Sequence, residues 1–314
     1  MTKEYLDLKM DFMFKQLFGQ PSRKAITIAF LNDLLHRKEN DPITDVQYEN
    51  TELMKESDDG KTSRLDVLVF TSGGERINVE IQMINQHDMP ERVLYYWSRL
   101  FSASISSGQN YSELTPTIMI TILNYPLFPY ETDNFHTVFH VREDTEHFIW
   151  SSHLEIHAID LSQFVVKWKK YSREIKENPP AELPWLMMLS AADYAKKRIN
   201  EDFFRELEEF SMNEQEVREA LIEWETLSAN KENKALYEAR LKFLRDQLSN
   251  IVGERRAGKE EGFKEGMKHG IEQGMEQGMK QLIQNMVKNG VTVSKIAKMT
   301  GIREEEVREL LSEK

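Results

Sequence analysis

Cysteine is absent from this chain of 314 residues. Without thiols there is no disulfide scaffold, no thiolate zinc site and no cysteine nucleophile. Such a composition suits the reducing cytoplasm, where we expect the protein to reside. Long apolar runs are absent as well. The longest strongly apolar stretch, Ile118 to Leu123, is much shorter than the ~20 residues of a bilayer-spanning helix, so we expect no membrane partner.

Positive charge is in deficit. The 41 Lys and Arg residues are outnumbered by 53 Asp and Glu residues, which leaves a formal net charge of −12. This excludes a blanket basic surface for nucleic acid, so a DNA-binding surface would have to be local or assisted by divalent cations. Two catalytic signatures are also missing, the Gly-rich Walker loop and the G-x-S-x-G nucleophile elbow.

The composition and the residue pattern of the sequence change along the chain. Residues 1–160 alternate helical and strand-like patterns, and residues 161–250 are charged with a helical period. Glycine recurs at every fourth position within residues 251–281, and residues 282–314 form a compact tail with a helix-turn-helix pattern. We therefore predict a core domain at 1–160, a helical region at 161–250, a helical or linker segment at 251–281 and a small tail domain.

The core domain is predicted to be an α/β sandwich with a mixed sheet, because helical and strand-like segments alternate in it. Two helices are expected between Met10 and Leu35, separated at Gly19 and Pro21. The remaining elements are predicted strands at 46–53, 64–70, 76–82, 117–123, 135–141 and 155–159, and a helix at 90–107. Residues 71–75 (TSGGE) would close a hairpin between the second and third strands.

Acidic side chains interrupt this predicted hairpin. Strand side chains alternate, so Glu80 and Gln82 share one face, and the hairpin register would place Asp66 beside Glu80. Burying two like charges together is costly unless a cation neutralises them, and hard carboxylate oxygens select Mg²⁺ or Mn²⁺. The alternative from spacing alone is that both acids face solvent on an antiparallel hairpin.

The order of several segments resembles one nuclease family. Asp66 followed by Glu80-Ile81-Gln82 is similar to the core motif of the PD-(D/E)XK nucleases, and the surroundings resemble the Rpn recombination-promoting nucleases and their PD-(D/E)XK family transposase relatives. The matching pieces are DFMFKQLFG (Asp11–Gly19), FLNDLL (Phe30–Leu35), RLDVLV (Arg64–Val69), NVEIQ (Asn78–Gln82), ERVLYYWSRLFS (Glu91–Ser102), LTPTIMITIL (Leu114–Leu123), EIHAIDLSQF (Glu155–Phe164) and the glycine-repeat tail.

The resemblance implies a restriction-endonuclease-like core and a DNA endonuclease that depends on Mg²⁺ or Mn²⁺. Its implied role is to promote recombination or to act on mobile or foreign DNA. By the same resemblance, Asp66, Glu80 and the carbonyl of Ile81 bind the metal. Gln82 occupies the position where the PD-(D/E)XK motif usually ends in Lys. The resemblance implies that the Rpn-like branch tends to carry Gln here, so we do not expect inactivation. The turnover rate is in question, because Gln can hydrogen-bond but carries no charge. Arg64, two residues before Asp66, is a candidate to contact substrate and supply the missing charge.

The first helix carries two further candidates. Related nucleases often place an acid there, which would make Asp11 a partner of the metal site, with Lys15 one turn later contacting phosphate. The alternative is a surface ion pair between the two, contributing ~0.3–0.5 kcal/mol. On the later helix, Arg92 is a candidate phosphate contact, whereas Tyr95 and Trp97 are expected to pack in the core.

Histidines recur at a spacing of four, at 136 and 140 and again at 153 and 157. On a strand that spacing corresponds to roughly 13 Å, too far for one metal, and no third ligand is evident nearby, so we expect no zinc site.

The helical region or the glycine repeat is the expected route to a homo-oligomer. Glycines at 258, 262, 266, 270, 274 and 278 would allow close approach of two backbones, although a solvated linker is the alternative. In the tail, Gly301 would form a turn between helices, but Arg303 is followed by three Glu residues that would repel phosphate. We therefore assign no DNA reading to the tail. A catalytically weak or inactive nucleic-acid-binding or self-assembly module remains the alternative function.

Overall fold

The computed structural model describes residues 5–37, 41–51, 65–193 and 198–312. The chain divides into two compact units, residues 1–243 and residues 244–314.

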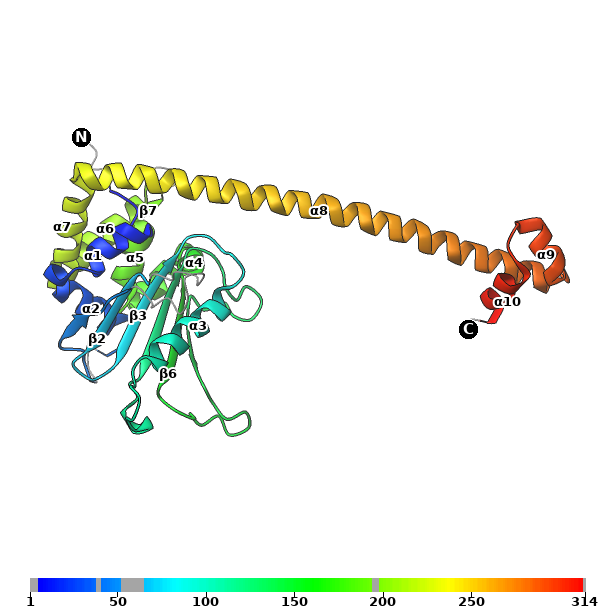
Figure 1. Ribbon diagram of the computed structural model, residues 1–314. Helices are drawn as coiled ribbons and strands as arrows, with labels where there is room; N and C mark the ends of the chain where they lie inside the picture. Colours follow the sequence, from blue (N-terminus) through cyan, green and yellow to red (C-terminus); the bar gives the residue numbers. More distant parts are fainter. Residues whose placement is uncertain (1–4, 38–40, 52–64, 194–197, 313–314) are drawn as a thin grey trace. The chain divides into compact units, whose positions relative to one another are not determined.

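The first unit is built on a six-stranded mixed sheet with the order β1-β2-β3-β4-β6-β5 (Figure 1). β2 and β3 form an antiparallel hairpin, β3, β4 and β6 are parallel, and β5 is antiparallel to β6. This confirms the predicted α/β architecture with a mixed sheet. The strands are β1 (Val46–Tyr48), β2 (Val67–Thr71), β3 (Arg76–Gln82), β4 (Thr117–Leu123), β5 (His136–His140) and β6 (Leu154–Asp160).

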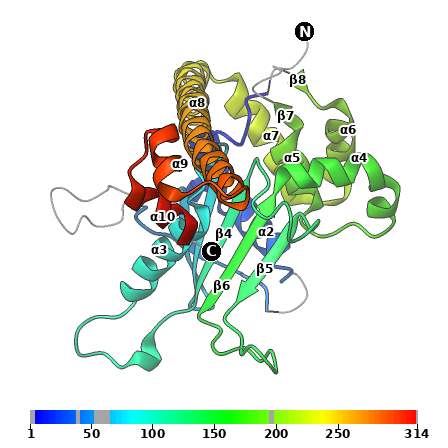
Figure 2. The same cartoon turned by 90° about the vertical axis from the view of Figure 1, so that its right-hand side faces the viewer.

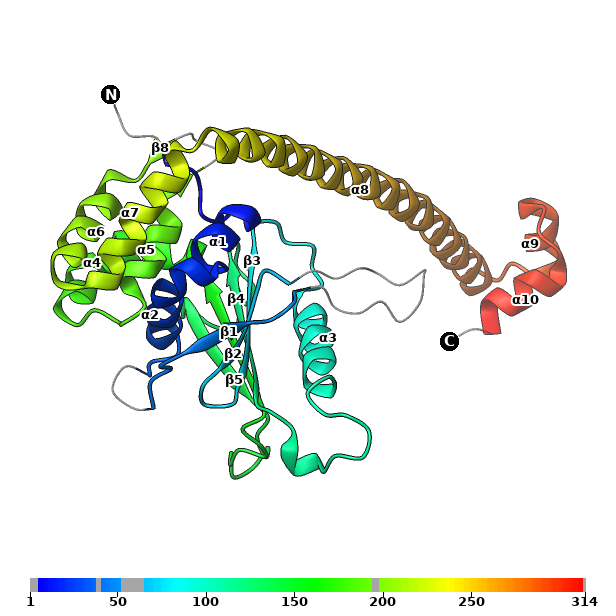
Figure 3. The same ribbon diagram turned by 60° about the vertical axis from the view of Figure 1, so that its left-hand side comes forward.

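Helices cover both faces of this sheet. α3 lies on one face, and α2, α4 and α5 lie on the other (Figures 2 and 3). The helices of the unit are α1 (Asp11–Phe18), α2 (Lys24–Leu34), α3 (Met89–Ser102), α4 (Leu161–Glu177), α5 (Leu183–Ala191), α6 (Glu201–Asn213) and α7 (Gln215–Ala229), followed by the start of α8 (Lys231–Lys288). Two short 3-10 turns (Pro21–Arg23 and Tyr111–Glu113) and a small ribbon, β7 (Ala192–Asp193) with β8 (Arg198–Ile199), complete it.

α3 ends earlier than its sequence pattern predicts. The predicted helix at 90–107 stops at Ser102, in front of a segment rich in Ser and Gly. The Ser104 hydroxyl donates to the carbonyl of Phe101 at 2.7 Å, a local bond of the kind by which serine competes with helix continuation. The correction shortens the helix but leaves its apolar face intact.

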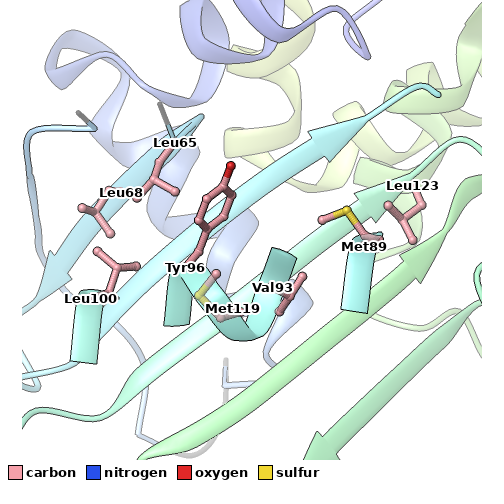
Figure 4. Close-up of a cluster of buried hydrophobic side chains, with 8 residues drawn as sticks. All are labelled: Leu65, Leu68, Met89, Val93, Tyr96, Leu100, Met119 and Leu123. Carbon is pink, nitrogen blue, oxygen red and sulfur yellow. The ribbon is translucent and has the colours of Figure 1, made fainter. Parts of the chain in front are cut away.

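A compact apolar cluster joins α3 to the sheet (Figure 4). Its members are Leu65, Leu68, Met89, Val93, Tyr96, Leu100, Met119 and Leu123. The four contributed by α3 recur at spacings of three and four, which places them on one helical face. Tyr96 belongs to this face and is 6% exposed, whereas Tyr95 is 52% exposed, so the prediction that Tyr95 packs in the core is wrong.

The opposite face rests on aromatic packing. Phe18 stacks on Phe30 with ring centroids 4.3 Å apart, and both rings contact Trp185 of α5 edge-on. The Trp185 ring N–H donates to Asp33 at 2.7 Å. The later helices join the same unit, since the Trp224 ring N–H donates to the carbonyl of Leu6 at 2.8 Å.

The second unit holds the rest of α8 together with α9 (Val293–Thr300) and α10 (Glu304–Ser312). Ile283, Ile296 and Val307 form its small core. Gly301 ends α9 in the left-handed conformation with φ 73°, at the predicted turn. The repeat glycines lie in the helix α8, where a Cβ added at any of them would meet nothing within 4 Å. Self-association through them stays a prediction.

No helix among the described residues combines the length and the apolar character needed to cross a bilayer.

Candidate active site at the end of the β2–β3 hairpin

The hairpin brings the two predicted acids together. Val67 pairs with Val79, and one further step of this antiparallel register sets Asp66, the residue before β2, opposite Glu80. Strand alternation places Glu80 on the face that α3 covers. Asp66 is 8% exposed and Glu80 is 1% exposed. The alternative in which both acids face solvent is therefore wrong.

Each carboxylate is tied to the other strand by a backbone N–H. The N–H of Ile81 donates to Asp66 Oδ2 at 2.9 Å, and the N–H of Asp66 donates to Glu80 Oε1 at 3.3 Å. These crossed bonds lie next to the ladder pair of Val67 with Val79. They fix both carboxylates before any ligand arrives.

Glu80 retains one unsatisfied oxygen. Asn78 donates to Oε1 at 3.3 Å, whereas Oε2 is buried and accepts no hydrogen bond from the described residues. Arg92 on α3 holds its guanidinium nitrogen 3.6 Å from that oxygen. Burial, followed by the charge of Asp66, raises the pKa of Glu80 to about 8. The free protein therefore holds a proton where a cation would relieve the same electrostatic cost.

Lys15 reaches the acid pair from α1. Its Nζ lies 2.9 Å from Asp66 Oδ1, with the lysine side chain 24% exposed. Burial raises the pKa of Asp66, and the neighbouring Lys15 charge and the N–H of Ile81 counteract part of that increase. Lys15 therefore forms an ion pair with Asp66 of the hairpin.

Asp11 lies on the same helix, and Arg240 of α8 pairs with it at 3.5 Å. Its negative charge also contributes to the raised pKa of Asp66, which places it near the site. The predicted alternative of an ion pair between Asp11 and Lys15 on a surface helix is replaced by these two separate pairs.

Three further candidates lie on or next to the hairpin: the carbonyl of Ile81, Gln82 and Arg64. The carbonyl of Gln82 accepts from the N–H of Asn124, next to β4. Because successive residues of a strand direct their backbone groups to opposite sides, the carbonyl of Ile81 faces the Asp66 side together with its N–H. Gln82 is half-buried and follows Glu80 on the same face. Arg64 lies outside the described residues.

Tyr96 positions Arg92. The guanidinium Nε donates to the Tyr96 hydroxyl at 3.1 Å, and its central carbon lies 5.3 Å from the centre of the Tyr96 ring. Since Tyr96 is anchored in the apolar cluster, this pair directs Arg92 toward Glu80 (Figure 4 shows the Tyr96 side chain). Arg92 therefore belongs to the site, although its contact with a phosphate stays a prediction.

The donor set suits a hard divalent cation. Two carboxylates and a backbone carbonyl offer oxygen ligands only, which Mg²⁺ and Mn²⁺ prefer. The buried Oε2 of Glu80 supports this fit, because a carboxylate oxygen that accepts no hydrogen bond from the described residues is costly in the interior until a proton or a metal ion binds it.

A second polar cluster was not found by sequence reasoning. His36, His136 and Glu182 place their ligand atoms within 4.8 Å of one another. The spacing of histidines in the sequence groups His136 with His140 on one strand. In the structure these two histidines contact different carboxylates, Glu182 and Glu155. No spacing in the sequence links residues 36, 136 and 182.

Comparison with known families identifies the family to which the chain is similar. The model of the PD-(D/E)XK nuclease family transposases matches residues 8–254, a range that contains Lys15, Asp66, Glu80 and Arg92. No curated protein and no solved structure matches the chain significantly.

Proposed function

Because this chain belongs to the PD-(D/E)XK nuclease family transposases, we propose that it is a divalent-metal-dependent DNA endonuclease that hydrolyses phosphodiester bonds. The observation that carries the proposal is the buried pair of Asp66 and Glu80, with one carboxylate oxygen left without a hydrogen bond among the described residues. The proposed biological role is to promote recombination or to act on mobile or foreign DNA. A cytoplasmic location and a homo-oligomer are part of the same proposal.

The metal would be held by Asp66, Glu80 and the carbonyl of Ile81. When bound, Mg²⁺ or Mn²⁺ polarises a phosphate oxygen and lowers the pKa of a bound water. The hairpin contributes rigidity, since crossed hydrogen bonds from Ile81 and Asp66 hold both carboxylates in place. Such preorganisation lowers the cost of reorganisation during the reaction.

Lys15 supplies the charge that position 82 lacks. Gln82 stands where the PD-(D/E)XK superfamily motif usually ends in Lys, and it can orient a water molecule by hydrogen bonding but cannot offset negative charge at phosphorus. The Lys15 ammonium, 2.9 Å from Asp66 and partly exposed, carries both a charge and further donor capacity to the same site from α1. Arg92 partly neutralises Glu80 from the α3 side.

Nicking of supercoiled plasmid DNA tests this function. The full chain is assayed with Mg²⁺, with Mn²⁺ and with excess EDTA, beside Asp66→Ala, Glu80→Ala and the control Asp202→Ala on the surface of α6. We expect metal-dependent nicking by the wild type and the control, and a loss of roughly 10³-fold or more in the two hairpin variants. Circular dichroism checks that all variants fold.

Cleavage that persists in both folded hairpin variants would overturn the proposal. The second candidate is a nucleic-acid-binding or assembly module that has lost catalysis, which the Gln at position 82 favours. DNA retarded in a gel without any metal-dependent cut would support that candidate instead.

A further inference from the structure

A histidine–glutamate cluster lies on the sheet face opposite the acid pair. The register aligns Glu80 with Ala158 and with Thr137, whereas His136 pairs with Ile159, so alternation turns His136 to the other face. β4 and β6 also separate β3 from β5. The two clusters are therefore distinct sites, and this inference does not rest on the proposed nuclease function.

Three segments that are distant in sequence contribute to the cluster. His36 follows α2, His136 begins β5, and Glu182 directly precedes α5. His136 Nδ1 lies 3.2 Å from Glu182 Oε1, and His36 Nδ1 lies 3.6 Å from Glu182 Oε2. The two imidazole rings stack with their centroids 5.7 Å apart.

We propose that His36, His136 and Glu182 bind a Zn²⁺ ion. With one ligand atom from each residue, the three atoms lie within 4.8 Å of one another. Ligand atoms on a tetrahedral zinc, each at 2.0–2.1 Å, are about 3.3–3.4 Å apart, so zinc binding would draw these three atoms closer together. Two imidazoles and one carboxylate are also a ligand set that zinc takes with a fourth position left for water. His36 is half exposed, which gives solvent access to that position.

Glu182 is buried, and one of its two carboxylate oxygens lacks a hydrogen-bond donor among the described residues. The residue is 3% exposed, and its Oε2 accepts no hydrogen bond from the described residues. A buried carboxylate oxygen of this kind needs a cation or a proton. The oxygen faces the imidazole of His36, which is the geometry expected of two ligands around one ion.

A relay of hydrogen bonds fixes the orientation of His136. His136 Nε2 lies 2.8 Å from His157 Nδ1, and His157 Nε2 lies 2.7 Å from Glu155 Oε1. The carboxylate of Glu155 can only accept, so His157 donates to it from Nε2 and turns its Nδ1 toward His136.

His136 contacts His157 through Nε2, so its Nδ1 is the nitrogen directed at Glu182. Nδ1 lies 3.2 Å from a carboxylate oxygen, and this contact needs either a proton on the ring nitrogen or a cation between the two atoms. Zinc-bound histidines are typically held by such outer partners, through the nitrogen that does not bind metal.

Zinc binding to the full chain tests this site. The protein is stripped with EDTA and titrated with ZnCl₂ in excess Mg²⁺, which competes for the acid pair, and zinc content and affinity are measured by elemental analysis and calorimetry. We expect about one Zn²⁺ per chain. His36→Ala and Glu182→Gln should each weaken binding at least ~100-fold, and His157→Gln about 10–100-fold. The control His269→Ala alters an exposed histidine of α8 and should leave affinity unchanged.

Thermal unfolding provides a readout that needs no enzymatic activity. At free Zn²⁺ about 100 times Kd, the melting temperature should rise by about 5–10 °C in the wild type and the control, but not in His36→Ala. Absence of zinc binding, or equal affinity in the wild type, His36→Ala and Glu182→Gln, would overturn the proposal and show that a proton alone satisfies the cluster. Zinc binding lost in Asp66→Ala but retained in His36→Ala would overturn it too.

Discussion

The two faces of the central sheet carry polar clusters that differ in how far apart their residues lie in the sequence and in how their charges are compensated. On the α3 face, Asp66 and Glu80 come from one hairpin, and the chain brings Lys15 and Arg92 to neutralise them. On the other face, His36, His136 and Glu182 come from three distant segments. The first cluster is encoded locally and compensated by charge. The second depends entirely on tertiary packing, and a hydrogen bond between His136 and His157 orients it.

This difference predicts how a bound cation would stabilise each of the two clusters. The acid pair keeps a raised carboxyl pKa even with two cations nearby, so its cost in the free protein is electrostatic. The histidine cluster brings together segments far apart in sequence, so an ion bound there would contribute mainly by cross-linking them.

Exchanging residues 15 and 82 tests how positive charge compensates the acid pair on the α3 face. Lys15→Gln should reduce nicking about 10²–10³-fold, because it removes the charge next to Asp66. The double variant Lys15→Gln/Gln82→Lys should recover about tenfold of that loss by restoring a cation from β3. Initial nicking rates at saturating Mg²⁺ provide the measurement. A rate in Lys15→Gln equal to that of the wild type would refute the role of Lys15.

Replacing Glu80 with Gln tests whether the acid pair destabilises the metal-free fold. The pKa of Glu80 is raised from its usual 4.5 to about 8, so the folded state retains a proton that the unfolded state has released. Stability of the wild type should therefore fall as pH rises from about 4.5 to about 8, and level off above that.

Glu80→Gln removes the part of this dependence that Glu80 contributes and should stabilise the metal-free protein at pH 7–8 by about 1–3 kcal/mol, while abolishing nicking. Urea unfolding in EDTA across this pH range measures the effect. If wild type and variant show parallel pH profiles, Glu80 does not carry the buried proton.

Tyr96→Phe is the mildest test of the α3 face. The change removes the hydroxyl that accepts from Arg92 but keeps the ring in the apolar cluster. Losing one such hydrogen bond should cost ~1 kcal/mol in the positioning of Arg92, and so reduce kcat/KM about three- to tenfold. A parallel loss of stability would be seen in urea unfolding. Full activity would show that Arg92 needs no support from Tyr96.

The sequence predicts well what adjacent residues determine. The hairpin around residues 71–75 follows from turn residues between two alternating runs, and β4 has the predicted bounds Thr117–Leu123. The same local pattern places Asp66 opposite Glu80. The break between α1 and α2 follows from Gly19 and Pro21 in the same way.

Contacts between distant segments are beyond this kind of reasoning. The pairing of Lys15 with Asp66 depends on how α1 packs near β3, and the choice of Tyr96 over Tyr95 depends on the direction of the α3 face. The histidine cluster was missed because the spacing of histidines on one strand says nothing about residues 36 and 182. Periodicity identifies faces, but only the packed structure identifies which face meets which.

A crystal of the full chain grown with Mn²⁺, measured at a wavelength where manganese scatters anomalously, tests the central claim most directly. The account predicts an anomalous peak at about 2.0–2.3 Å from oxygens of both Asp66 and Glu80, with a further contact from the carbonyl of Ile81. The account would be contradicted if manganese occupied other positions in the crystal and the acid pair held no ion. Lys15 and the backbone N–H groups would then remain the partners of the two acids.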